Sequence, residues 1–206
     1  MIPGKIVPSD NLIMSPKDKS QNLKESFESG GISLENSTRG LFYQNWHAKT
    51  DGQKIYIKAE NEKQWLEVLS DTKITEVDLT FDQNMRPHLT YVSNGVAKFY
   101  YHNFYANKFI IESYPDIKNP RISLDDKRRD IGSSSSDIIF AYIKKETNEL
   151  CYRVQRERYL TEHNTNIFVK ENDILWRIGM GKNNAFLFYI LNDPDQSDDD
   201  LDNWVI

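Results

Sequence analysis

A hairpin spacing that occurs twice constrains the fold of this chain most strongly. In LTYVSNGVAKFYY, Tyr91 precedes an apolar strand residue by 8 positions and a second tyrosine by 10. FAYIKKETNELCY repeats both intervals, from Tyr142 to Leu150 and Tyr152. The connections VSNGVAK and IKKETNE each carry a turn signal near the point of reversal. We therefore predict an all-β chain with homologous hairpins, in which Tyr91 and Tyr142 are equivalent.

A third copy of this unit is predicted to be split between the two ends of the chain. Arg177–Ile190, RIGMGKNNAFLFYI, aligns without a gap on Leu79–Val92 and sets Tyr189 on Tyr91. It supplies two strands, and LFY at 41–43 matches the missing third strand. A sheet completed from both ends hides edges that would otherwise pair with other chains. The prediction is an antiparallel propeller-like repeat of about three blades of roughly 40 to 50 residues.

Residues 1–39 are predicted to be an extended or helical arm outside the core. They are polar and carry little hydrophobic periodicity. SPKDKSQNLKESFESGG has Ser15 as N-cap and Pro16 at the first helical position, and it stops at a Gly pair. On that helix Leu23 and Phe27 form one docking stripe. The arm is either a tail that orders little or a segment that reaches a neighbouring subunit.

Residues 40–191 have the short, punctuated strands of a β-repeat domain. LFYQNWHA, KIYIKA and QWLEVL belong to the first blade. KFIIESY at 108–114 is the expected outer strand of the second unit, and RYLTEH at 158–163 that of the third. The segment KRRDIGSSSSD at 127–137 replaces a tight turn with a solvated loop.

Residues 192–206, NDPDQSDDDLDNWVI, form an acidic tail with an apolar end. The aspartates repel one another and do not pack. The apolar end of the tail therefore either stays undocked in solvent or docks on a partner protein. It consists of Trp204, Val205 and Ile206.

Acidic and basic residues recur at matching strand ends, which invites an acid–base or sugar-binding interpretation. These residues are Asp82, Asp125, Asp126, Arg86, Arg128 and Arg129. An Asp at the end of the same strand in successive units is more simply a turn-former whose carboxylate accepts backbone N–H bonds. We predict no catalytic residue and no enzymatic activity.

Other chemistry has little support in the sequence. The histidines at 47, 88, 102 and 163 lack metal-ligand spacing, and we predict neither a metal nor a cofactor. The single cysteine, Cys151, is expected to be a buried, inert thiol. With 26 basic against 31 acidic residues and a pI of about 5.4, the chain does not favour nucleic acid as a partner. The sequence contains no run of 18 apolar residues, so we do not predict a membrane span.

Three segments resemble a family of structural proteins from the virions of tailed bacteriophages. They are ITEVDLTFDQNMRPHLTYVSNGVAKFYY, RISLDDKR, and SDIIFAYI with the following YRVQRERY. The resemblance covers roughly residues 40–191. It implies a non-enzymatic virion component, associated with the tail or tail fibre and contacting other virion proteins.

Two function classes follow. In the first, the chain is a structural or adaptor protein of the phage tail, and two copies pair head to tail into a six-bladed ring. Closure within one chain is the alternative. In the second class, the chain is a carbohydrate-binding or glycan-cleaving propeller in which exposed aromatics such as Trp46, Trp65 or Tyr101 stack on sugars.

Overall fold

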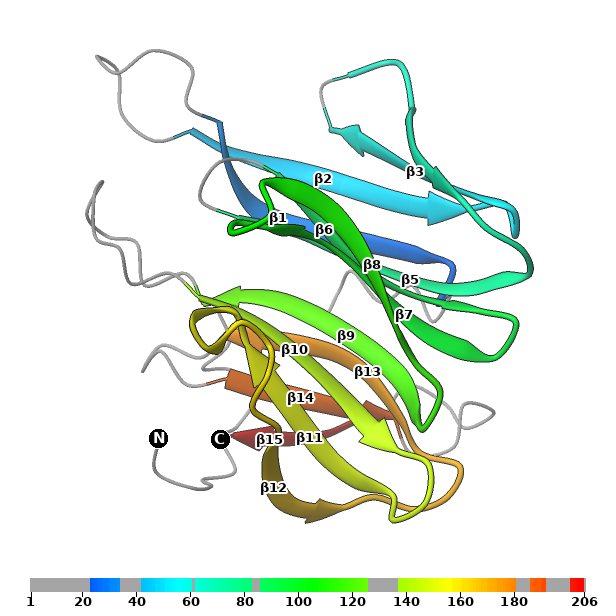
Figure 1. Ribbon diagram of the computed structural model, residues 1–206, viewed down its shortest axis with the longest axis vertical. Coiled ribbons are helices and arrows are strands. Elements are labelled where there is room, and N and C mark those ends of the chain that lie inside the picture. The colour runs from blue at the N-terminus through cyan, green and yellow to red at the C-terminus, as the bar shows by residue number, and fades with distance from the viewer. Residues whose placement is uncertain are drawn as a thin grey trace.

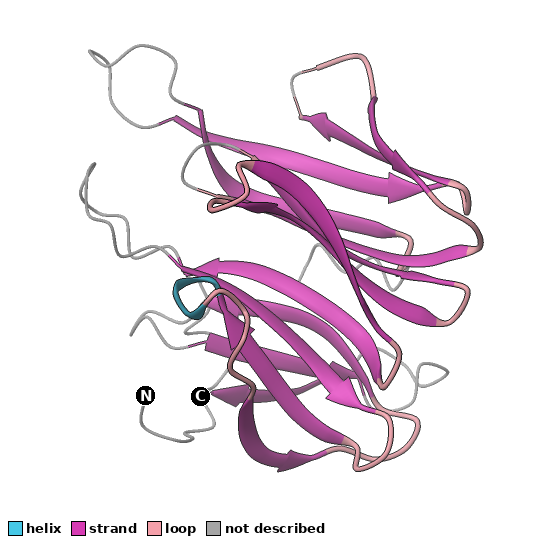
Figure 2. Ribbon diagram, in the orientation of Figure 1, coloured by secondary structure: helices cyan, strands magenta, loops and turns pink. Residues whose placement is uncertain are grey.

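The computed structural model describes residues 23–33, 42–60, 62–82, 86–125, 137–180, 186–191 and 201–205. These residues form antiparallel β-sheets and one short 3₁₀ turn, and no α-helix occurs among them (Figure 1, Figure 2). The predicted all-β class is confirmed.

Four sheets are present, and each is a meander whose strands pair in chain order. Sheet 1 contains β1 (Glu25–Ser33), β2 (Phe42–Thr50), β3 (Lys54–Ala59) and β4 (Leu66–Ser70). Sheet 2 contains β5 (Ile74–Phe81), β6 (Pro87–Ser93), β7 (Val96–Asn103) and β8 (Lys108–Tyr114). Sheet 3 contains β9 (Ile117–Asp125), β10 (Asp137–Lys144), β11 (Glu149–Val154) and β12 (His163–Phe168). Sheet 4 contains β13 (Ile174–Met180), β14 (Phe186–Leu191) and β15 (Leu201–Val205).

Local sequence explains the strands and the tight turns. KIYIKA in β3 alternates half-buried and buried positions, so Ile55 and Ile57 face the core. The β6–β7 reversal uses Asn94 and Gly95, both at positive φ (51° and 74°). Asn-Gly is the sequence that a two-residue hairpin turn of this kind favours.

The core lies between neighbouring sheets. One cluster joins sheets 1 and 2, a second joins sheets 2 and 3, and a third joins sheets 3 and 4. The first strands of the sheets, β1, β5, β9 and β13, lie beside one another in that order. In each sheet the first strand is therefore innermost, next to the first strand of the neighbouring sheet.

The described sheets form an open series. No core cluster among the described residues joins sheet 4 back to sheet 1. Four sheets are present where the repeat predicted about three, because residues 25–70 form a complete sheet of their own. The described residues do not form a closed propeller.

The helix predicted in the arm is wrong for the residues that the structure describes. Glu25–Ser33 is strand β1, which pairs antiparallel with β2 and has an irregularity between Ser29 and Gly31. The backbone oxygen of Leu23 accepts a hydrogen bond from the Val77 N–H at 2.8 Å. For residues 25–33, pairing with β2 outweighs local helical preference. The predicted helix start, Ser15 and Pro16, lies outside the described ranges.

The split blade is also wrong. β14 pairs with β13, as the predicted hairpin requires, but its other neighbour is β15, whose Trp204 lies opposite Phe188. The segment at 42–50 instead pairs with β1 and β3. The third strand of sheet 4 thus comes from the apolar end of the tail, which removes the strand exchange proposed for the six-bladed ring.

Tyr189 does not face the way that Tyr91 and Tyr142 face. Tyr91 belongs to the cluster toward sheet 1, and Tyr142 to the cluster toward sheet 2, so each points to the preceding sheet. In β14 it is Phe188 and its alternate neighbours that point toward sheet 3. Because side chains alternate along a strand, Tyr189 points to the opposite face. In β14, the predicted alignment of Arg177–Ile190 on Leu79–Val92 is therefore displaced by one residue.

Bulges nevertheless relate the three hairpins. The register shifts between Ile74 and Glu76 in sheet 2, between Leu175 and Arg177 in sheet 4, and opposite Tyr142 in sheet 3. In each case the shift lies near the start of the first strand, but Tyr189 is not equivalent to Tyr91 and Tyr142, so the predicted three-copy repeat is not confirmed. The outer strand of sheet 2 is as predicted, whereas that of sheet 3 begins only at His163.

Candidate functional site: an aromatic and arginine surface

Two large aromatic side chains project from the turn between β7 and β8. Asn103 Oδ1 accepts hydrogen bonds from the backbone N–H groups of Tyr105 and Ala106, each at 3.0 Å. Asn107 adopts a φ of 47°, which completes the tight reversal. The turn leaves Phe104 54% and Tyr105 73% exposed. The fold therefore holds two rings in solvent on an ordered turn.

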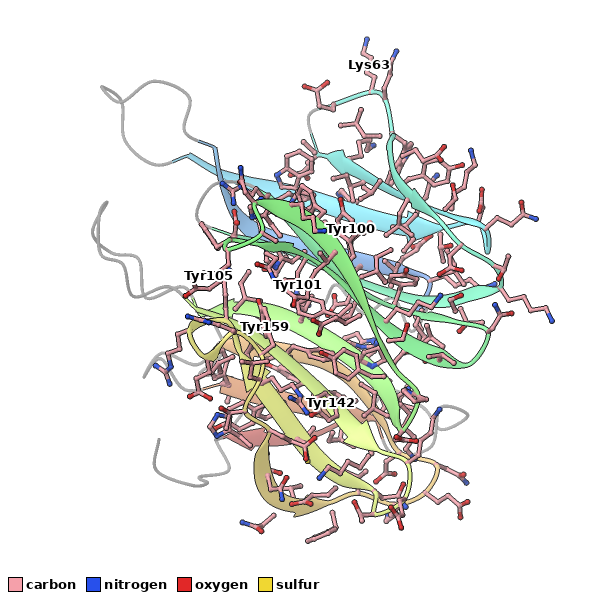
Figure 3. All side chains as sticks on the ribbon, in the orientation of Figure 1. Lys63, Tyr100, Tyr101, Tyr105, Tyr142 and Tyr159 are labelled. Carbon is pink, nitrogen blue, oxygen red and sulfur yellow. The ribbon has the colours of Figure 1, made fainter. Side chains whose placement is uncertain are left out.

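An arginine lies on each ring. The Arg158 Cζ atom is 3.8 Å from the centroid of Tyr105, and the Arg86 Cζ atom is 5.0 Å from that of Phe104. Arg158 follows the 3₁₀ turn η2 (Gln155–Glu157) of sheet 3, with a φ of 58°. We call Arg86, Phe104, Tyr105, Arg158 and the 74% exposed Leu160 the aromatic–arginine surface. In Figure 3, Tyr105 lies at the edge of the molecule, while Tyr101 and Tyr159 lie further in.

Buried polar side chains hold Arg86 on its interior side. Asp82 Oδ1 accepts the Arg86 backbone N–H at 2.9 Å, and Asp82 Oδ2 lies 3.7 Å from His88 Nε2. Arg86 Nη1 bonds the His102 ring, which stands edge-on to Phe104 with centroids 5.6 Å apart. Burial lowers the pKa of His88, against the opposing effect of Asp82. Burial therefore favours the neutral form of His88, and Arg86 and Arg158 carry positive charge at this surface.

The turn role predicted for Asp82 is confirmed by its bond to the Arg86 N–H. Asp125 ends β9 opposite Asp137. Asp126, Arg128 and Arg129 lie outside the described residues. The structure therefore supports the turn-former interpretation at Asp82.

The aromatic residues suggested for sugar stacking do not present open ring faces to solvent. Tyr101 is 6% exposed. Trp46 is half-buried and packs on Phe81 with centroids 4.8 Å apart. The Trp65 ring has the Lys49 and Lys58 ammonium groups 4.2 and 5.2 Å from its centroid. Phe104 and Tyr105 are exposed instead. Sequence reasoning missed both, although two aromatics between the asparagines of NFYAN were a signal.

The predicted docking residues are not brought together. Leu23 is half-buried beside β5, and Phe27 lies in β1 opposite His47. Trp204 and Val205 lie in β15, on sheet 4. Ile206 is outside the described residues. These positions belong to sheets at opposite ends of the series.

A second polar group links the inner strands. Arg121 Nη1 is 2.9 Å from Glu76 Oε2, and Arg121 Nε donates to the Trp176 carbonyl at 2.7 Å. Asp78 Oδ2 accepts the Ile122 N–H at 2.9 Å, and burial raises the pKa of Asp78. These contacts tie sheets 2, 3 and 4 together near their first strands, which is a structural role.

Other chemical groups are quickly located. Cys151 is buried, and burial raises the pKa of its thiol to about 12. Among the described residues, no cluster of three or more His, Cys, Asp or Glu side chains has a geometry suited to a metal ion. No described helix has the length and apolar character needed to cross a membrane.

Comparison of the chain with protein-family models, with curated proteins and with solved structures found no match.

Proposed function

We propose that this protein is a non-enzymatic structural or adaptor component that binds another protein through the aromatic–arginine surface. The observation that carries the proposal is the pair of exposed rings, Phe104 and Tyr105, each covered by an arginine. Tyrosine and arginine dominate the binding energy of protein interfaces. An ordered turn also loses little conformational entropy on binding.

The sequence resemblance described above supplies the setting, a tailed-bacteriophage virion with the chain in the tail or tail-fibre attachment apparatus. A virion component has to hold a fixed shape while it contacts its neighbours. Four sheets packed through continuous cores suit that requirement, and Arg121 joins the inner strands of sheets 2, 3 and 4.

The protein composition of washed particles tests this role. We expect quantitative mass spectrometry to find the chain at a fixed copy number in virions of the phage that encodes it. A chain present in the infected-cell lysate and absent from washed particles would overturn the virion role.

A homo-oligomer remains part of the proposal. The open series of four sheets supports it, because a second copy packed end to end would close the series into a ring of eight sheets, a number found in closed propellers. Light scattering after size exclusion would then report twice the 24.2 kDa of one chain. A strictly monomeric folded protein removes the ring.

Glycan binding is the second candidate, because exposed tyrosine rings also stack on sugars. The relevant variants are now Phe104→Ala and Tyr105→Ala in place of changes at Trp46 and Trp65. Tight binding on a glycan array, lost in both variants and kept in Phe168→Ala, would favour this function over protein binding.

A further inference from the structure

We infer that the aromatic–arginine surface takes an acidic protein segment that carries an apolar or aromatic side chain. This inference rests on the binding role proposed above and names the chemistry of the partner. Two arginines from different sheets meet at one turn, and each lies over an exposed ring of that turn.

Arg158 supplies an uncompensated positive charge. Its guanidinium has no carboxylate partner among the described residues, and its side-chain contact is the Tyr105 ring. The adjacent Glu157 is engaged by His163 Nε2 at 2.7 Å, and Glu162 binds Lys144 and the Tyr142 hydroxyl. A guanidinium stacked on a ring still has donors at its edge, in the planar geometry that suits a carboxylate.

Arg86 supplies a second positive charge, which Asp82 compensates only in part. Its Nη1 atom is 3.9 Å from Asp82 Oδ2, beyond hydrogen-bond distance. Asp82 also accepts the Arg86 N–H and lies close to His88, so its charge is partly used within the fold. The Arg86 side chain is 30% exposed and is oriented by Phe104 and His102. A partner carboxylate can therefore approach it without rearrangement of the surface.

The apolar requirement comes from Phe104, Tyr105 and Leu160. More than half of each residue is in contact with solvent. A partner with carboxylates and no apolar side chain would leave these three side chains in solvent. Its binding would gain no free energy from the burial of apolar surface. A segment with acidic residues around one tryptophan or leucine meets both requirements.

Single-stranded nucleic acid is the competing ligand, because aromatic rings and arginines also stack on bases. Such binding needs a basic groove along the phosphate backbone. The chain has a net charge of −5 and a pI of about 5.4, and Glu157 and Glu162 lie next to the surface. Two arginines at one turn match a short segment with a few carboxylates, whereas the net negative charge opposes a long polyanion more strongly.

The test is fluorescence anisotropy with the full chain and a labelled peptide, Asp-Glu-Trp-Asp-Glu-Leu-Asp-Glu. We expect saturable binding that weakens as salt rises from about 0.05 M to about 0.5 M, since exposed charges are screened. The same peptide with lysine at every acidic position should not bind. Equal binding of both peptides, or tighter binding of a thymidine oligonucleotide, overturns the inference.

Variants locate the binding. Arg158→Gln and Tyr105→Ala should each weaken binding of the acidic peptide roughly tenfold, the scale of an interface anchor. Lys63→Gln also removes one exposed positive charge, but far from Tyr105 in Figure 3, and Phe168→Ala removes an exposed ring from β12. Both controls should stay within about twofold. Equal losses in Lys63→Gln and Arg158→Gln would mean that net charge alone drives binding, which contradicts the inference.

The two proposals fail separately. If the chain is found in virions but does not bind the acidic peptide, the adaptor role stands and the inferred partner chemistry is wrong. A chain absent from virions that binds the peptide through Arg158 keeps the surface and loses the virion role.

Discussion

The interface between sheets 2 and 3 differs from the interface between sheets 1 and 2 at its outer rim, although both are built from the same kind of meander. Each has a buried centre. Phe99 and Phe140 stack with centroids 4.9 Å apart in the first, and Leu79, Leu89 and Ile55 are fully buried in the second. The difference begins toward the edge strands.

Tyrosine hydroxyls and carboxylates close the rim between sheets 2 and 3. Glu112 accepts hydrogen bonds from the Tyr101 and Tyr114 hydroxyls at 2.7 and 2.6 Å. Glu162 accepts the Tyr142 hydroxyl at 2.6 Å, and Arg153 Nε donates to that hydroxyl oxygen at 3.0 Å. Aromatic bodies fill the interior here, and their polar tips are hydrogen-bonded at the edge.

Aliphatic and aromatic side chains at the rim between sheets 1 and 2 stay in solvent. Leu66 is opposite Ile57 in the β3–β4 pair, so it faces sheet 2, yet it is 60% exposed. Phe109 stacks on Tyr100 and is 40% exposed, and Ile111 is 50% exposed. Side chains without a polar tip leave the outer part of this interface open. The comparison teaches that both interfaces have a buried apolar centre. They differ in whether the side chains of the edge strands close the outer rim with hydrogen bonds or leave it open to solvent.

Loss of the central ring between sheets 2 and 3 should have the largest effect. Phe99→Ala removes a fully buried ring that contacts Phe140, Tyr101 and Tyr159. We expect the free energy of unfolding to fall by roughly 3 to 5 kcal/mol, measured by urea denaturation. Phe168→Ala, at an exposed position, is the control. Equal stability of the two variants would show that this interface does not hold the fold.

Removal of a rim hydroxyl should cost less. Tyr142→Phe keeps the ring and leaves Glu162 and Arg153 without one hydrogen-bond partner. The expected loss is roughly 1 to 3 kcal/mol in the same assay. An unchanged denaturation midpoint would mean that solvent replaces the hydroxyl, and the two rims would then be energetically alike.

Acid should weaken the same interface through His88, which faces sheet 3 near Asp82, Arg86 and His102. Its pKa is lowered by burial, so the folded chain binds fewer protons than the unfolded chain below the usual value of about 6.5. Stability is therefore present above that pH and declines as pH falls through it, by at most about 1.4 kcal/mol per unit.

Urea denaturation at about pH 7.5 and about pH 5.5 measures this effect. We expect His88→Phe to have a smaller difference between the two pH values than the unchanged chain. His163→Gln, at a half-exposed histidine that pairs with Glu157, serves as the control. A pH dependence that survives in His88→Phe assigns it to other groups.

Changes at the open rim should have the smallest effect. Leu66→Thr and Ile111→Thr alter side chains that are already largely in water. The free energy of unfolding should change by no more than about 0.5 kcal/mol. Ile55→Thr, at the buried centre of the same interface, should destabilise by far more. A large loss at Leu66 would indicate that this rim is covered in solution.

The hairpins could be predicted because their signals are local. Asn94-Gly95 specifies a tight turn, and alternation in KIYIKA specifies which residues of β3 are buried. The outer strand at 108–114 and the turn role of Asp82 follow from the same kind of pattern. The face of Tyr189 could not be predicted, because a gap-free alignment does not reveal a one-residue difference in packing.

By itself, the sequence determined the hairpin strands of sheets 2 and 3, their partners and the buried environment of Cys151, since period and turn chemistry act over a few residues. Only the tertiary structure decided that Glu25–Ser33 is a strand, that β15 completes sheet 4, and that Arg158 of sheet 3 lies on Tyr105 of sheet 2. These outcomes depend on contacts between segments far apart in the chain. In such contacts, the burial of apolar surface and the pairing of strand edges outweigh local preference.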